Sequence, residues 1–383
     1  SLDDMNAPVN TARLEAVDES INLAHDIVNY FYLPDLLAIG KIYVEKGMVD
    51  GGGLSKKRVM SYGGYPDEPY TGISNGDFFA KSVVRSNGVV ENFAAGVENA
   101  KFIPLEGPDF MDPQILAEEV EHSWFEYPNG EEALHPIDGV TEPKYTGPKT
   151  GTKEHWEYLD EDKKYSWIKS PVFRGGTTEV GPLAKYIVVY TKVKQVIITN
   201  PTWAEKMMVD QIETVSKVLG LPAHVWMTTM VGRTACRALD AQVAAALSRY
   251  FYNKLIANIK AGDTSVANSD KFDPSTWPKD AKGVGILDAP RGGLGHWIHI
   301  KDGRSENYQC IVPSTWNACP RTVKGEHGAY EDAMIDTHVK VPDQPLEIIK
   351  VIHSFDPCLA CATHLYNKEG QPIVSVNTDA LCK

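Results

Sequence analysis

The stretch Ser354-Phe355-Asp356-Pro357-Cys358-Leu359-Ala360-Cys361-Ala362-Thr363-His364 lies near the end of the sequence. Its two cysteines stand three residues apart, and a histidine follows three residues after the second. Thiolates are soft ligands, and this spacing lets both reach a single metal ion. The same pair also occurs in redox disulfides and in iron–sulfur ligand sets. The spacing alone is therefore compatible with half a zinc site, with a redox pair or with part of an iron–sulfur site.

The composition is that of an ordinary globular protein and narrows the class of partner. The chain has 383 residues, of which 43% are hydrophobic and 23% charged, and its net charge is −13. This charge argues against nucleic acid as a partner, because phosphates require a basic face. No apolar run approaches the roughly 20 residues of a membrane span. Six cysteines with one close pair do not form a disulfide framework, so the thiols are expected to be ligands or core residues.

Hydrophobic periodicity and turn residues predict the helices. Apolar residues at helical spacing predict a helix over residues 10–32, ending before Pro34 because the residue before a proline avoids the helical region. A second helix is expected over 203–219 with its stop at Gly220, and a third, the longest, over 223–261. A fourth, over 345–353, leads into the cysteine motif.

Two parts of the chain are expected to be rich in strands and turns. Residues 51–169 are dense in Gly, Pro, Asp and Tyr, which predicts short strands between turns. The acidic run 118–122 is expected at the surface, and the scattered histidines 122, 135 and 155 at the surface or in loops. Residues 284–316 predict strands over 284–287, 296–300 and 308–312, with a hairpin turn at Asp302-Gly303. Residues 288–293 would form a loop between the first two of these strands.

Few other side chains outside the motif could carry chemistry. Arg291 lies in that Gly- and Pro-containing loop, where its guanidinium could bind an anion or form a surface salt bridge. Ser314 could donate to an anionic ligand or cap a turn. His296 and His299 have an odd separation on one strand, so they point to opposite faces and cannot chelate together. Cys236 lies inside the longest predicted helix and is expected to be a core thiol.

Several ordered blocks together resemble the large subunit of [NiFe] hydrogenases, of the respiratory membrane-associated uptake type. Residues 356–364 match the C-terminal signature of that family, and the resemblance runs in order over essentially the whole chain. The other blocks are residues 165–171, 179–184, 232–235, 288–292 and 307–317. The resemblance implies an α+β fold with a long-helix bundle core and peripheral β-rich segments.

The resemblance also implies a division of the chain into five segments. Residues 1–50 would be part of the central helical bundle, 51–180 a β- and loop-rich peripheral region, 181–282 the long-helix bundle, 283–364 a β-rich segment with the metal-binding motif, and 365–383 a maturation peptide. The family's first C-x-x-C, which supplies two further nickel thiolates, is not found in this sequence. We therefore expect an N-terminally truncated chain that retains its maturation peptide and is inactive alone.

The site that the resemblance implies combines a nickel–iron pair with a magnesium ion. Cys358 would be a terminal nickel ligand, and Cys361 would bridge nickel to an iron that carries carbon monoxide and two cyanides. Arg291 would stand over the metals beside Pro290, paired with Asp356, and Ser314 would donate a hydrogen bond to a cyanide. His364 would ligate Mg²⁺ together with the backbone carbonyl of Cys310, and would also be the residue after which the chain is processed.

The activity implied is heterolytic cleavage of H₂, with Arg291 or a nickel thiolate as the base. Electrons would leave through an iron–sulfur small subunit to a membrane cytochrome b or another acceptor. A maturation protease would act in the cytoplasm, and the small subunit would carry both chains to the periplasmic side of the cytoplasmic membrane. Two alternatives remain: a metal-free structural or electron-transfer subunit derived from the same family, and a zinc or redox C-x-x-C protein.

Overall fold

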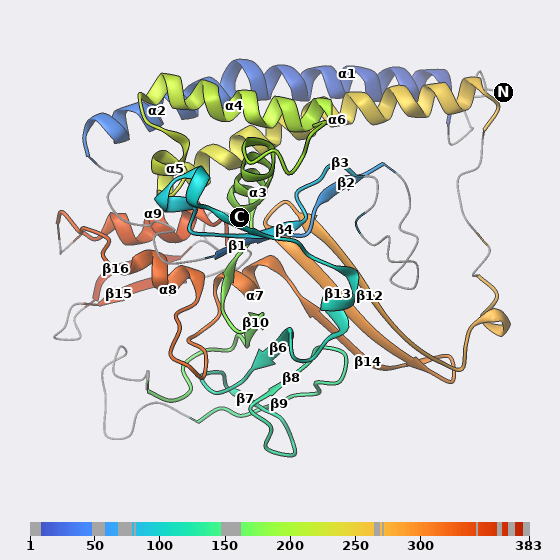
Figure 1. The fold of residues 1–383 in the computed structure, drawn as a ribbon, viewed down its shortest axis with the longest axis vertical. Helices are drawn as coiled ribbons and strands as arrows, with labels where there is room; N and C mark the ends of the chain where they lie inside the picture. Colours follow the sequence, from blue (N-terminus) through green and yellow to red (C-terminus); the bar gives the residue numbers. More distant parts are fainter. Residues whose placement is uncertain are drawn as a thin grey trace.

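The structure is a computed structural model in which most of the chain is described. The described residues are 9–47, 58–67, 79, 82–146, 162–263, 269, 272–341 and 344–357, and the backbone alone of 362–366 and 372–377. Helices run across one side of the molecule and small sheets lie beneath them (Figure 1). This arrangement confirms the predicted α+β class.

One long helical stretch opens the described part of the chain. It consists of α1 (Thr11–Ile27), a π-helical turn η1 (Val28–Tyr32) and α2 (Leu33–Glu45), and Asn10 caps its start by accepting from the Arg13 N–H. The predicted helix end before Pro34 is therefore wrong. In the π-helical turn the Leu33 N–H reaches back five residues to the Val28 carbonyl, and this wider turn accommodates a proline that has no N–H to donate.

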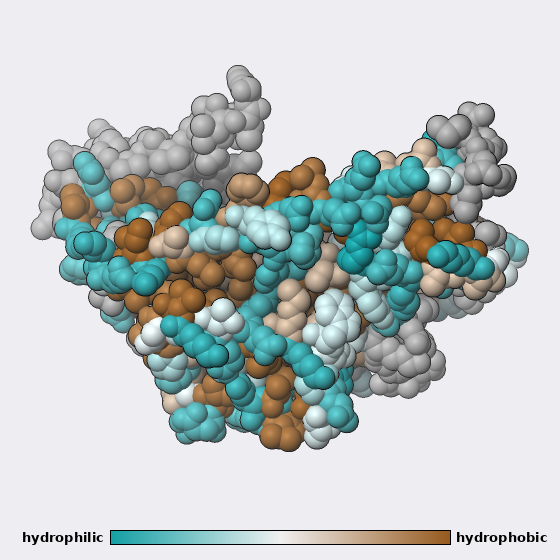
Figure 2. Space-filling view, turned by 90° about the horizontal axis from the view of Figure 1, so that it is seen from above, coloured by the Kyte–Doolittle hydropathy of each residue, from teal (hydrophilic) through white to brown (hydrophobic). Residues whose placement is uncertain are grey.

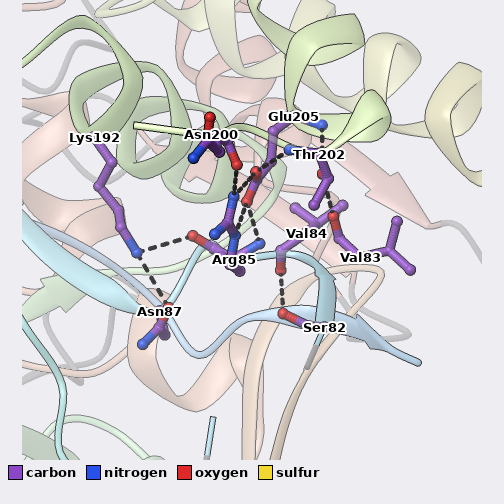
Figure 3. Close-up of polar contacts among 9 residues, drawn as sticks. All are labelled: Ser82, Val83, Val84, Arg85, Asn87, Lys192, Asn200, Thr202 and Glu205. Carbon is purple, nitrogen blue, oxygen red and sulfur yellow. Dashed lines mark hydrogen bonds and ion pairs between the residues drawn. The ribbon is translucent and has the colours of Figure 1, made fainter. Parts of the chain in front are cut away.

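The helix α4 (Trp203–Leu219) has the bounds that its sequence predicts. Thr202 and Glu205 form a capping box at its start, and Gly220 ends it with a φ of 67°. Glu205 also binds Arg85, whose backbone N–H and Nε each donate to Oε1 at 2.9 Å (Figure 3). Lys192 lies beside this pair and donates to the Arg85 carbonyl and to Asn87. These contacts tie the helices to the chain between two strands.

The longest predicted helix is divided in two. α5 (Ala223–Trp226) is followed by a turn, and α6 (Met230–Lys260) then begins with Thr229 as its cap. At the joint, Gly232 passes so close to the carbonyls of Trp226 and Met227 that a Cβ atom there would overlap both. The predicted single helix over 223–261 is therefore wrong at its start, where the chain turns and Gly232 closely approaches the backbone of the preceding turn.

A buried helix and a mixed sheet form the centre of the molecule. α3 (Pro182–Lys194) is buried along almost its whole length and packs against α4 and α6. Beneath it lies a four-stranded sheet in the order β11 (Thr178–Glu179), β1 (Arg58–Ser61), β4 (Gly88–Glu91), β5 (Lys101–Ile103); β11 and β1 are parallel, and the other pairs are antiparallel. Their apolar side chains fill the largest core.

A long antiparallel hairpin sheet reaches from the edge of the molecule to its centre. It has the order β12 (Asp280–Ala289), β13 (Gly292–Lys301), β14 (Arg304–Ile311), and the predicted turn at Asp302-Gly303 joins the last two (Figure 1). The loop predicted over 288–293 is wrong. Ala289 pairs directly with Gly292, so Pro290 and Arg291 alone form a two-residue turn at the central end of the hairpin.

The remaining elements are short. The strands are β2 (Gly64–Pro66), β3 (Ser82–Val84), β6 (Leu116–Glu119), β7 (Phe125–Glu126), β8 (Ala133–Leu134), β9 (Glu142–Pro143), β10 (Ser170–Phe173), β15 (Ala362–Tyr366) and β16 (Pro372–Asn377), and the helices are α7 (Pro313–Asn317), α8 (Ala329–Met334) and α9 (Leu346–Ser354). α9 confirms the helix predicted before the cysteine motif. Within the described part of the chain, no helix has both the length and the apolar composition that a membrane span requires.

One surface prediction in the peripheral region is wrong, and one of the histidines lies in a loop, as one of its two predicted settings, but is buried there. Glu118 is buried and accepts from Lys169 at 2.7 Å and from Gln309 at 2.6 Å. His135 is buried as well; its Nε2 bonds the Phe110 carbonyl, and its Nδ1 accepts from the Ile137 N–H. Both contacts of Glu118 reach its Oε2, and these polar contacts offset the cost of burying the charged group. His155 lies outside the described residues.

Candidate metal centre

Two segments that are distant in sequence meet at the central end of the β12–β13 hairpin. Arg291 donates from Nε to the backbone carbonyl of Asp356 at 2.8 Å, and the same nitrogen lies 3.2 Å from the Asp356 Oδ2. Asp356 has a φ of 55°, a left-handed conformation that turns its carboxylate and its carbonyl toward the same guanidinium. The predicted pairing of Arg291 with Asp356 is thus present, two residues before Cys358.

A second guanidinium, from α6, binds the same two segments. Arg237 Nη1 lies 3.4 Å from the Asp356 Oδ2 and 3.5 Å from the Pro290 carbonyl, and Nη2 donates to the Ser354 carbonyl at 3.2 Å. Arg237 lies just after the block 232–235 and had no predicted role. Its position one helical turn after Arg233 is the sequence signal for it, because residues four apart share a helix face.

A buried ion pair and two close approaches fix the position of the hairpin end. Glu179 binds Arg233 with contacts of 2.7 and 3.0 Å, and the guanidinium lies 4.0 Å from the centre of the Phe355 ring. Gly292 has a φ of 120°, and a Cβ atom on it would overlap the Gly181 nitrogen. These contacts hold the hairpin, α6 and the residues before Cys358 in one arrangement.

A cavity of about 340 Å³ lies beside these residues. Its wall includes Arg237 and Asp356 on one side and a buried pair on the other, in which Lys185 Nζ contacts both Asp240 oxygens at 3.0 and 3.1 Å. Burial alone would lower the pKa of Lys185, but Asp240, Tyr65 and Asp288 together outweigh burial and raise that pKa above its usual value, so the lysine stays charged.

The described residues also place the other predicted site positions. Ser314 is buried in the first turn of α7, and Cys310 is half-buried near the end of β14, where it pairs with His296. Cys236 is a buried core thiol, as predicted. Cys358 and Cys361 lie outside the described residues, and His364 is described only by its backbone in β15. Among the residues that are described, no group of three His, Cys, Asp or Glu side chains could hold a metal ion.

Comparison with known proteins identifies the family. The family model "Nickel-dependent hydrogenase" matches residues 1–364 of the chain. The chain belongs to the nickel-dependent hydrogenases. The uptake hydrogenase large subunit of Rhizobium leguminosarum bv. viciae is 46% identical over 370 residues, which cover 96% of this chain and 58% of that protein. The hydrogenase-1 large chain of Escherichia coli is 42% identical over 369 residues, with the same coverage.

Solved structures show the same fold. The Ni-Fe-Se hydrogenase from D. vulgaris Hildenborough in the reduced state superposes with a TM-score of 0.66 at 24% identity, covering 91% of this chain and 60% of that one. The chain thus spans a little under 60% of the length of the curated relatives it matches. These similarities confirm two predictions. The chain is similar to [NiFe] hydrogenase large subunits of the uptake type, and it has their fold.

The charges at Asp356 fit the metal group of this hydrogenase family. Arg237 and Arg291 share one carboxylate, Asp356, so these three side chains together carry one net positive charge. Thiolates and anionic diatomic ligands are negative, and buried anions need cations or donors close by. The residues present therefore fit an anionic metal cluster.

Proposed function

We propose that this chain supplies part of the catalytic centre of a [NiFe] hydrogenase that oxidises H₂ to protons and electrons. The observation that carries the proposal is the convergence of Arg291 and Arg237 on Asp356, two residues before the C-x-x-C pair, in a chain whose family is nickel-dependent. A zinc or redox thiol pair would not require two guanidiniums fixed on one carboxylate beside it.

Each predicted site residue has a proposed role in holding the metals. Cys358 and Cys361 would hold the nickel–iron pair, and Pro290 and Ser314 would line the surroundings of its diatomic ligands. His364 and the backbone carbonyl of Cys310 would hold Mg²⁺. Support comes from the placement of two residues: Ser314 is buried in the first turn of α7, and Pro290 stands at the turn beside Arg291.

When bound, the metal pair supplies the redox chemistry by which H₂ is split. The chain's own contribution is positional and electrostatic. Arg291 is held by the Asp356 carbonyl and carboxylate, and the backbone of its turn is held by the approach of Gly292 to Gly181. A guanidinium is a donor without an acceptor site, so we assign Arg291 to orientation and charge stabilisation at the metals, not to proton acceptance.

The proposed partners follow from the family. An iron–sulfur small subunit accepts the electrons, and a membrane cytochrome b or another carrier takes them onward on the periplasmic side of the cytoplasmic membrane. A maturation protease cleaves after His364, which is the last residue that the family model matches. Cleavage there would cut β15 two residues before its end and remove β16, its antiparallel partner.

Substitution of Cys361 tests the assignment. In the assembled enzyme, Cys361→Ser should lose nickel and abolish H₂-dependent dye reduction, because a hydroxyl is a poor bridging ligand for two soft metals. Cys319→Ser is the matched control: Cys319 is a buried thiol that donates to the Trp316 carbonyl, as a hydroxyl also can, and activity should remain. Retained H₂ oxidation in Cys361→Ser contradicts the site. A wild-type complex without nickel would instead indicate the metal-free structural subunit.

A further inference from the structure

Oxidation of H₂ releases two protons with every two electrons, and the protons need acceptors that lead away from the metals. The cavity beside Arg237 and Asp356 offers space for such a route. By volume, 340 Å³ holds on the order of ten water molecules. Its wall is mainly apolar, but three carboxylates line it, from Asp240, Asp288 and Asp356, and these offer polar partners to water.

The three carboxylates differ in their partners. Asp240 is paired with Lys185, and Asp356 with Arg291 and Arg237. Among the described residues, the recorded contacts of the Asp288 carboxylate are with neutral donors: Oδ2 accepts from the Ser61 hydroxyl and Oδ1 from the Tyr62 N–H at 3.0 Å. A carboxylate with neutral donors takes up a proton more readily than one in an ion pair.

From this geometry we propose that the Asp288 carboxylate is a proton acceptor of the reaction, reached from the metal centre through the water-sized space of this cavity. The inference rests on the proposed hydrogenase function. Each H₂ yields two protons and two electrons, and the electrons pass to the small subunit. The Asp288 carboxylate takes up one proton at a time, becomes a carboxylic acid, and then releases the proton to water. Asp288 lies on β12 three residues before Arg291, so the hairpin that positions the guanidinium also positions the acceptor.

The surroundings of Asp288 favour exchange of this proton. Burial raises the pKa of the Asp288 carboxyl, while Lys185 and the Ser61 and Tyr62 donors oppose the rise, and Asp240 adds to it. The charged and titratable groups that face it are Tyr62 just after β1, Tyr65 from β2, Lys185 from α3, Arg237 and Asp240 from α6, Arg291 from its own hairpin, and Asp356. Lys185 stays charged and therefore tunes Asp288 without exchanging its own proton.

The test compares Asp288→Asn with the wild type in the assembled enzyme. Loss of a proton acceptor should lower kcat for H₂ oxidation on the order of 100-fold and leave the KM for H₂ unchanged. The acid limb of the pH–rate profile should disappear, because the acceptor must be ionised to take a proton. A second readout does not use turnover: an infrared carboxylic-acid band that titrates in the wild type and shifts in D₂O should be missing from the variant. The nickel content should not change.

Two further variants keep the proposal falsifiable. Ser61→Ala removes a donor that stabilises the carboxylate, so the acid limb and the carboxyl band should both move to higher pH, with the maximal rate retained. Asp280→Asn, on the same strand at its exposed end, should behave as the wild type.

Wild-type kcat, pH profile and carboxyl band in Asp288→Asn would overturn the proposal. If Asp288→Asn fails to take up nickel, an unmoved acid limb and band in Ser61→Ala overturn it instead. A wild-type enzyme that contains nickel and iron but does not oxidise H₂ would contradict the proposed function itself, which this set of results separates from failure of the Asp288 role.

Discussion

At the scale of single residues, the groups around a buried lysine decide whether its pKa is raised or lowered. Lys185 and Lys192 stand on the same helix, and both are buried. Lys185 has a carboxylate at 3.0 Å, whereas the nitrogen of Lys192 is bonded to the neutral acceptors Arg85 O and Asn87 Oδ1 at 3.1 and 3.2 Å (Figure 3). The pKa of Lys185 is therefore raised, and burial lowers the pKa of Lys192 to about 8.

The depressed pKa of Lys192 predicts a pH dependence of stability. Below about pH 8 the lysine is charged in both the folded and the unfolded protein, and burial of the charge disfavours folding. Between about pH 8 and the ordinary value of 10.5 the folded protein loses this proton first, so the unfolded state binds more protons and the free energy of unfolding rises with pH. Across this pH range, the shifted pKa of Lys192 would raise the free energy of unfolding by up to about 3 kcal/mol.

This dependence can be measured by urea unfolding of the wild type and Lys192→Met from pH 7.5 to 10.5. The stability of the wild type relative to this variant should increase with pH across that window. Lys194→Met is the matched control, since Lys194 is on the same helix but is half-exposed and paired with Glu213. If the stability of the wild type relative to Lys192→Met stays constant or falls with pH, burial does not lower the pKa of Lys192.

At the scale of elements, the β12–β13 turn carries the strongest backbone requirement near the site. Gly292→Ala should destabilise the protein by more than about 2 kcal/mol, because a φ of 120° strains a side chain and the added Cβ overlaps Gly181 and lies 2.7 Å from the Val180 carbonyl carbon. Arg291 should move with the turn, so H₂ oxidation should fall as well.

The matched control for this turn is Gly285→Ala on β12. A Cβ atom there meets nothing within 4 Å and the backbone is not left-handed, so the change should be close to neutral in thermal unfolding. If Gly292→Ala were as stable as Gly285→Ala, the close approach to Gly181 would not hold the hairpin end in place.

Elements whose signals are local were predictable from the sequence. The stop at Gly220 and the Asp302-Gly303 turn both act within a few residues, and the structure confirms each. The errors have tertiary or unusual causes. Pro34 is accommodated by a π-helical turn, and the break before α6 depends on Gly232 meeting carbonyls of the preceding turn.

The candidate site also has one part that could be predicted from the sequence and another part that could not. Arg291 and Asp356 were found because the blocks that contain them resemble a family, and the structure brings the two together. The Lys185–Asp240 pair joins two helices, and Asp288 meets Ser61 from a strand more than 200 residues earlier. No spacing along the sequence reports such pairings. Glu118 was misplaced for the same reason, because its partners Lys169 and Gln309 come from distant segments.

At the scale of the whole molecule, one side of the first helical stretch is unusually apolar for a surface. We call this side the apolar helix face; its exposed residues are Leu23, Ile27, Tyr30, Phe31, Ile39 and Ile42, on α1, η1 and α2. Seen from above, hydrophobic side chains gather on the half of the surface where α2 lies (Figure 2). Contiguous apolar surface of this kind marks a protein interaction site.

The chain produced on its own should therefore self-associate through the apolar helix face. Burial of each large apolar side chain contributes roughly 1.5–3 kcal/mol, so the double variant Tyr30→Ser/Phe31→Ser should weaken association more than about tenfold. Sedimentation velocity over a concentration series measures this directly. Val196→Ser is the control, because Val196 is exposed but lies in the turn after α3, away from that face. A monomeric wild-type chain, or equal association of the double variant and the wild type, would show that these side chains do not mediate contact.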